Sequence, residues 1–205
     1  GKTFFWDGRA ATLEQQVLLP IQNKDEMDMT VPEVLARFPN LTAATLQNAL
    51  ATYVRTILAG DSPYDRYLAG DKNALTAQQL AGLRLFRGKA NCASCHVGPN
   101  LTDERFHNTG AGLQPDPGRF AVTQRPEDKG AFKTPTLREL PVRAPYMHDG
   151  SLKTIEDVID FYNKPDRKTA NLDPEIRPLR LSPPEEQALA AFLRSLSGVV
   201  KDGYE

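Results

Sequence analysis

Five consecutive residues constrain the fold of this chain more than any other part of its sequence. Cys92, Ala93, Ser94, Cys95 and His96 form a C-x-x-C-H motif, and the chain contains no other cysteine. In c-type attachment the two thiols bind a haem covalently and the adjacent histidine coordinates its iron. A chain with this motif has to fold around a flat apolar ring. The motif therefore predicts a haem c attached to Cys92 and Cys95, with His96 as the proximal ligand of the iron.

Other uses of two cysteines and a histidine explain the motif less well. A structural zinc site needs a second ligand pair at a suitable spacing. A thioredoxin-like redox pair belongs in a βαβ unit, and convincing strand alternation is absent from the sequence. A plain disulfide between Cys92 and Cys95 leaves His96 without a role. Haem attachment accounts for all three residues. Because haem is normally attached covalently outside the cytoplasm, we expect a periplasmic protein.

The charge balance and the hydropathy limit the classes of partner that we expect. The chain has 205 residues, with 25 basic and 26 acidic side chains. This balance does not favour a polyanion, so no nucleic-acid partner is expected. No apolar run approaches the roughly 20 residues that span a bilayer, so no membrane span is expected. The length is enough for one domain with a real core, or for one domain and part of another.

Helix-start signals recur along the chain. The capping-box pattern, in which Ser or Thr precedes Glu or Gln by three residues, begins at Thr12, Thr30, Thr76 and Ser182, and Thr154 is a further N-cap candidate. These signals predict a short helix limited by Pro20, a helix to about Phe38, a helix ending near Gly88, one after Thr154 and a last one closed by Gly198. The fold class expected is therefore all-α, with long ordered loops.

Several predicted helices carry an apolar stripe. Apolar residues lie three and four positions apart over residues 42–58, in Leu46, Leu50, Tyr53, Val54, Ile57 and Leu58. The helix after Thr154 has a stripe of Ile155, Val158, Ile159 and Tyr162, and the last helix places Leu189, Phe192, Leu193 and Leu196 inward. Residues 98–150 show no sustained period, and such long segments usually wrap something or carry a site. Gly, Pro and Asp in "GDSPYDRYLAGD" mark a turn or a domain junction.

The second axial ligand of the iron has several candidates. Met147, in "APYMHDG", lies in a loop downstream of the haem motif and before the last helix, where a small cytochrome often places this ligand. Met27 and Met29 precede the motif and fit this position badly. His107 or His148 would give a haem with two histidine ligands. Each of these histidines has an alternative role as a hydrogen-bonding group, for example to a haem propionate.

Several motifs together resemble one family. In order, they are "FFWDGRA", the single C-x-x-C-H, "DERFHNTG", "GAFKTPTLRELPVRAPYMHDGSLKTIEDVIDFYN" and "LSPPEEQALAAFLRSLSG". They resemble the bacterial di-haem cytochrome c peroxidase and MauG family. The resemblance implies two c-type haems in two cytochrome c-like domains. By motif order, Cys92, Cys95 and His96 belong to the second haem, and the first attachment motif is expected upstream of Gly1. Residues 1–68 are then the helical remainder of the first domain, and residues 69–205 form the second.

The resemblance also assigns roles near the peroxide-reacting first haem. It implies that Trp6 passes electrons between the two haems, and that Glu26 acts as a general acid–base during cleavage of the O–O bond. Pro20 and Met27 match residues that line the same pocket. Without the resemblance, Trp6 is a buried aromatic anchor and Glu26 is a solvated acid in the run "KDEMD".

The remaining assignments concern the second haem and the reaction. The resemblance implies a calcium bound by the backbone carbonyls of Arg143 and Pro145. Tyr162 occupies the place of a tyrosine axial ligand of MauG-type members, with Met147 as the alternative ligand and a core tyrosine as the alternative role. The family implies oxidation of a protein or another electron donor by hydrogen peroxide. The alternatives are a classical cytochrome c peroxidase with a Met-ligated relay haem, and a mono-haem electron-transfer protein.

Overall fold

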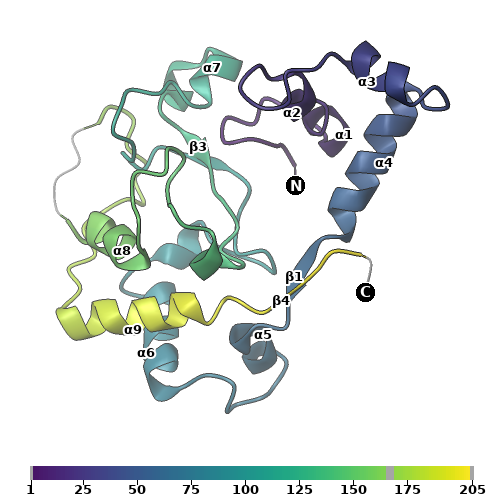
Figure 1. Ribbon diagram of the computed structural model, residues 1–205. Helices are drawn as coiled ribbons and strands as arrows, with labels where there is room; N and C mark the ends of the chain where they lie inside the picture. Colours follow the sequence, from purple (N-terminus) through teal and green to yellow (C-terminus); the bar gives the residue numbers. More distant parts are fainter. Residues whose placement is uncertain (1, 165–168, 204–205) are drawn as a thin grey trace.

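The computed structural model describes residues 2–164 and 169–203, and this part of the chain is largely helical (Figure 1). The α-helices are α1 (Leu13–Gln16), α2 (Leu19–Gln22), α3 (Val31–Arg37), α4 (Ala43–Thr56), α5 (Pro63–Leu68), α6 (Ala77–Arg87), α7 (Phe120–Thr123), α8 (Ile155–Asn163) and α9 (Pro183–Arg194). Short 3₁₀ turns are η1 (Cys92–Ser94), η2 (Pro126–Asp128) and η3 (Leu140–Val142), and the strands are β1 (Leu58–Gly60), β2 (Phe106–His107), β3 (Phe132–Lys133) and β4 (Val199–Lys201).

Local capping chemistry fixes where most of the longer helices begin. Thr30, Thr76 and Thr154 accept a hydrogen bond from the amide three residues later, and the side chain there returns one to the cap. The helices predicted after these residues are confirmed. The prediction that Pro20 limits the first helix is wrong. Pro20 lies in the first turn of α2, where a backbone N–H would have no hydrogen-bond partner within the helix. The last helix ends at Arg194, before the predicted stop at Gly198.

Two small antiparallel ladders depart from the all-α expectation. β1 pairs with β4, with Ala59 opposite Val200, and β2 pairs with β3, with His107 opposite Phe132. Each strand has only two or three residues. An alternating pattern cannot be recognised over so short a stretch, so sequence periodicity could not reveal these strands.

The main core lies between α6 and α9, which cross in the lower part of Figure 1. The Phe86 and Phe192 ring centroids are 5.1 Å apart, and Tyr64 of α5 meets Phe192 edge-on at 5.2 Å. The predicted inward stripe of the last helix is confirmed, since Leu189, Phe192 and Leu196 are at most 1% exposed. This core forms one wall of the cavity described below.

Helix α4 stands apart from that core, beside α1 to α3 (Figure 1). Its Ala51 is fully buried against Leu13 and Val17. Its apolar stripe is largely exposed, with Leu58, just after the helix, 63% exposed and Ile57 44% exposed. The small helices beside α4 cover only the strip around Ala51, and the rest of the stripe faces outward. No described helix combines the length and the apolar character that crossing a membrane requires.

Candidate haem site

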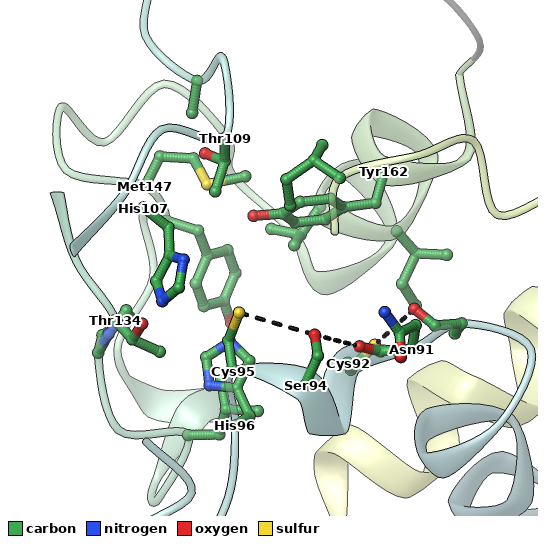
Figure 2. Close-up of a pocket in the computed structure, with 18 of the residues that line it drawn as sticks. Asn91, Cys92, Ser94, Cys95, His96, His107, Thr109, Thr134, Met147 and Tyr162 are labelled. Carbon is green, nitrogen blue, oxygen red and sulfur yellow. Dashed lines mark hydrogen bonds between the residues drawn. The ribbon is translucent and has the colours of Figure 1, made fainter. Parts of the chain in front are cut away.

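The cavity between η1, the α6–α9 core, α8 and the loops of residues 98–150 has a volume of about 220 Å³. Figure 2 shows the side chains around it. Most of its walls are apolar and come from Phe86, Leu137, Leu140, Ile155, Val158, Ile159, Leu179, Leu189 and Leu193. Phe132, Thr134 and Tyr146 of the long irregular segment also contribute to the lining. Walls of this kind suit a flat apolar ring, since burial removes its faces from water.

Both cysteines of the motif face this cavity. The chain leaves α6 through a tight turn, in which the Ala90 amide donates to the Leu85 carbonyl and Asn91 adopts a left-handed conformation with φ of 51°. This turn starts η1 at Cys92 and places Cys95 directly after it. Burial raises the pKa of the Cys92 thiol to about 12. Two thiols at the end of α6 thus border one cavity, as covalent attachment of a haem requires.

His96 is oriented by the loop that follows it. Its Nδ1 lies 2.9 Å from the Leu101 carbonyl oxygen, so Nδ1–H donates there and Nε2 keeps its lone pair. Burial lowers the pKa of His96, which favours the neutral ring that a metal needs. Leu101 itself adopts φ of 52°, which turns its carbonyl in this tight loop. The cysteines, the oriented imidazole and the apolar walls together fit a covalently bound haem.

Two candidate sixth ligands border the same cavity. Tyr162 and Met147 lie on the side away from His96 in Figure 2, and the Tyr162 hydroxyl points into the cavity. Tyr162 comes from α8, on the stripe that also carries Val158 and Ile159. Met147 comes from the loop before α8, in a left-handed conformation with φ of 70°. The cavity thus offers either a phenolic oxygen or a thioether sulfur opposite His96.

His107 is held by two acidic side chains. Its Nδ1 lies 2.6 Å from Asp173 Oδ2 and its Nε2 lies 2.9 Å from Asp103 Oδ2. Interaction with Cys95 and these two carboxylates raises the pKa of His107 to about 10, against the effect of its burial. The Cys95 contribution ends once that sulfur becomes an uncharged thioether. Because both ring nitrogens already bind carboxylates, His107 is poorly placed to coordinate iron.

Cys95, Asp103 and His107 also lie close enough together to resemble a metal site, with their ligand atoms within 4.8 Å of one another. Such a site would need the Cys95 thiolate, which haem attachment consumes. The Asp173 contact was missed from the sequence because Asp173 lies 66 residues beyond His107, and no local pattern links the two.

Two aromatic groups complete the edge of the cavity. The His148 ring stacks on Phe132 with centroids 3.6 Å apart and an angle of 12° between the planes. Trp6 also lines the cavity and is 40% exposed. The Lys133 amide donates to the Trp6 carbonyl at 2.8 Å, which ties the N-terminal loop to β3. Trp6 therefore has one side toward the cavity and another toward the surface, unlike a buried anchor.

Glu26, Pro20 and Met27 form a separate group beside α2. The Met27 amide donates to the Pro20 carbonyl at 3.2 Å, and the Glu26 carboxylate accepts from Asn23 Nδ2 at 2.8 Å. Glu26 and Met27 are exposed, and none of the three lines the haem cavity. The structure thus places Glu26, Pro20 and Met27 outside the cavity that Cys92 borders.

The predicted calcium ligands lie on an exposed bend. The Arg143 amide donates to the Leu140 carbonyl at 3.1 Å, and its guanidinium donates to the Thr136 carbonyl. Within residues 2–164 and 169–203, neither the Arg143 nor the Pro145 carbonyl oxygen accepts a hydrogen bond. Both oxygens therefore remain available to a cation.

Comparison with known proteins agrees with a haem site in this chain. Residues 1–41 match the family model of di-haem cytochrome c peroxidase. The methylamine utilization protein MauG of Methylorubrum extorquens is 40% identical, over 96% of this chain and 61% of its own length. A cytochrome-c peroxidase of Denitromonas iodatirespirans is 35% identical, over 95% and 65%. The crystal structure of a MauG-like protein associated with microbial copper homeostasis has a TM-score of 0.84 and 31% identity, covering 95% of this chain and 71% of that one. The chain spans less than two thirds of the length of these two curated relatives.

Proposed function

The chain belongs to the di-haem cytochrome c peroxidase and MauG family, and from this we propose that it holds the second haem of a MauG-like peroxidase. The observation that carries the proposal is the apolar cavity with Cys92, Cys95 and His96 on one side and Tyr162 on the other. Residues 69–205 form the proposed cytochrome c-like domain of this haem. Residues 1–68 belong to the domain of the first haem, whose attachment motif lies outside these 205 residues.

Different residues of the chain have different proposed roles around the second haem. When bound, haem supplies an iron that changes its oxidation state. Cys92 and Cys95 would hold the ring, His96 would offer its Nε2 atom to the iron, and the Leu101 carbonyl keeps that imidazole oriented. Tyr162 is the proposed sixth ligand, with Met147 as the alternative. An anionic oxygen ligand favours oxidised iron and lowers its potential, whereas a thioether raises it.

The proposed reaction joins the two groups of residues. Hydrogen peroxide accepts two electrons and two protons and gives two waters, and a protein or another donor supplies the electrons. Glu26 moves a proton during cleavage of the O–O bond. Trp6, at the edge of the cavity, would carry electrons between the second haem and the first. A calcium held by the Arg143 and Pro145 carbonyls would stabilise the bend that leads to Met147. The proposed location of the protein is the periplasm.

The experiment compares Glu26→Gln with Asp25→Asn in the full-length, haem-loaded protein. Asp25 is a neighbouring exposed acid paired with Lys24, so it is a matched control. Loss of the Glu26 proton relay is expected to slow the reaction with peroxide by about 10²–10⁴-fold in stopped-flow measurements, while Asp25→Asn reacts normally. A normal rate in Glu26→Gln would remove this residue from the mechanism. A single haem in the natural full-length polypeptide would contradict the peroxidase proposal and favour a mono-haem electron carrier.

A further inference from the structure

Three consecutive peptide carbonyls in the N-terminal loop accept hydrogen bonds from one segment of the haem-binding part. The Trp6 carbonyl accepts from the Lys133 amide at 2.8 Å. The Asp7 and Gly8 carbonyls both accept from Nη1 of Arg119, each at 2.9 Å. A single guanidinium therefore binds the two peptide groups that directly follow Trp6.

Arg119 is itself held in place for this contact. Its amide donates to the Ala131 carbonyl at 2.8 Å, which ties the start of α7 to the segment before β3. Its guanidinium lies 4.5 Å from the centroid of the Phe106 ring, within the range of a cation–π contact. The guanidinium of Arg119 thus faces carbonyl oxygens and an aromatic ring, and these contacts allow it to hold the N-terminal loop in place.

The loop fits closely onto this surface. It is closed by a hydrogen bond from the Phe4 amide to the Ala10 carbonyl, at 2.9 Å. At its tip Gly8 adopts φ of 70°, a conformation that favours glycine. A Cβ atom on Gly8 would lie 2.4 Å from Cζ of Phe106 and 2.7 Å from Nη1 of Arg119. Only glycine allows the loop to approach Phe106 and Arg119 this closely.

We propose that Arg119 is a positioning residue that holds Trp6 at the edge of the haem cavity. Without Arg119 the loop keeps the hydrogen bond from the Lys133 amide to the Trp6 carbonyl and the contact of Lys133 Nζ with the Thr3 carbonyl, so it remains attached at Trp6 and upstream of it. Downstream of Trp6 it loses both carbonyl contacts. Trp6 then samples positions farther from the haem, and electron transfer through it slows because such transfer falls steeply with distance. The last step rests on the proposed function, whereas the position of Trp6 does not.

The test uses the emission of Trp6 in the full-length, haem-loaded protein, and Trp6 is the only tryptophan among residues 1–205. A haem quenches indole emission more strongly at shorter distance, so the emission of Trp6 reports how near the haem it stays. Trp6→Phe in the same protein supplies the background to subtract. Arg119→Met removes every donor while keeping a long side chain, and Arg119→Lys restores one cationic donor. Arg125→Met is the matched control, because Arg125 is an exposed arginine nearby that pairs with Glu127 and Asp128.

We expect Trp6 emission and its quenching by acrylamide to rise severalfold in Arg119→Met, to recover in part in Arg119→Lys, and to stay unchanged in Arg125→Met. The haem absorption spectrum should be the same in the parent protein and in these three variants. Emission in Arg119→Met equal to that of the parent chain would overturn the inference. If Arg119→Met fails to fold, Gly8→Ala disturbs the same contact from the loop, and unchanged emission there would overturn it equally.

Activity separates this inference from the proposed function. If the protein is a peroxidase, Arg119→Met should react with peroxide at the parent rate but oxidise its electron donor more slowly. A parent protein with no peroxide-driven oxidation would contradict the proposed function and leave the emission result as it stands. Normal donor oxidation together with raised emission would retain the positioning role and remove Trp6 from the electron path.

Discussion

Two side chains at the far side of the candidate haem cavity, Tyr162 and Met147, are the candidates for the proposed sixth ligand. Tyr162 is carried by α8, whose start is fixed by the capping box of Thr154 and Asp157. Met147 lies in a loop, and its own backbone adopts a left-handed conformation that is uncommon for residues other than glycine. A helix holds its side chains more firmly than such a loop, and for this reason we propose Tyr162 rather than Met147 as the sixth ligand.

The ligand prediction compares Tyr162→Phe with Met147→Leu in the haem-loaded protein. We expect Tyr162→Phe to change the ferric optical and EPR spectra, because it removes the oxygen that we propose as the iron ligand, and Met147→Leu to leave them unaltered. Tyr146→Phe is the control, since Tyr146 also lines the cavity but donates its hydroxyl to the Leu140 carbonyl. Unchanged spectra in Tyr162→Phe, with altered spectra in Met147→Leu, would assign the position to Met147.

The pairing of Asp65 with Arg138 predicts a pH dependence of stability. Nη1 and Nη2 of Arg138 each donate to one oxygen of Asp65 at 2.9 Å, and this pairing lowers the pKa of Asp65 to about 2. Because the folded pKa lies below the unfolded value, the pair contributes stability above about pH 4 and loses it as the pH falls toward 2. Arg138→Met should therefore lower the free energy of unfolding by about 1.5–3 kcal/mol at neutral pH.

Urea unfolding at a series of pH values measures this effect. The difference between Arg138→Met and the parent chain should shrink as Asp65 becomes protonated. Arg194→Met is the matched control, because the Arg194–Glu156 pair is about half exposed on both sides, and its effect should stay within about 0.5 kcal/mol. A difference for Arg138→Met that stays constant down to pH 2 would contradict the prediction.

The haem motif shows how far a sequence specifies such a site. Cys92, Cys95 and His96 lie within five consecutive residues, so their chemistry could be predicted from spacing alone. The groups that support them are dispersed. Asp173 reaches His107 across 66 residues, and Arg119 reaches the Asp7 carbonyl across 112. These contacts depend on the folded loops of residues 98–150, whose path no periodicity describes.

Among the elements, helices could be predicted better than strands because their start signals are local. Thr76 and Gln79 specify the first turn of α6 without help from the rest of the chain. β2 and β3 form only because distant segments meet, and each has too few residues to show a pattern. The apolar stripe of α4 could be predicted, but a stripe does not tell what covers it, and Leu58 and Ile57 are exposed.

The crossing of α6 and α9 gives a prediction at the scale of elements. A Cβ atom on Gly82 would lie 2.0 Å from the Ala188 carbonyl oxygen and 2.7 Å from Cβ of Phe192. Replacing an exposed helical glycine with alanine usually stabilises by about 1 kcal/mol. Here the added methyl would push the two helices apart, so we expect Gly82→Ala to destabilise the protein by about 1–3 kcal/mol.

Thermal unfolding of the haem-loaded protein measures the cost of this methyl group. Gln78→Ala is the control, because Gln78 is exposed on the same helix and its replacement touches no packed surface. Its melting temperature should stay close to that of the parent, while that of Gly82→Ala should fall. A higher melting temperature in Gly82→Ala would mean that the helices do not approach each other closely at this position.

In the molecule as a whole, the last described residues return to the connection between α4 and α5. β4 pairs with β1, and the Asp202 carbonyl accepts a hydrogen bond from Oγ1 of Thr56 at 3.2 Å. The Gly198 amide donates to Oε1 of Glu139 at 2.8 Å, which fixes the start of this segment to the loop before η3. The segment that leads into the predicted junction, from Thr56 to Gly60, is therefore held by residues about 140 positions away.

This arrangement predicts that the C-terminal strand protects the connection without supporting the haem core. Deleting residues 199–205 removes β4 and the Thr56 contact, so the backbone after Arg55 should open more often and trypsin should cut there severalfold faster, as followed by mass spectrometry. Deleting only residues 203–205 keeps β4 and Asp202 and should leave the rate unchanged. The melting temperature of the haem-loaded core should be similar in both truncations, because α6 and α9 do not include these residues. Equal cleavage rates in the two truncations would show that the connection is stable without its strand partner.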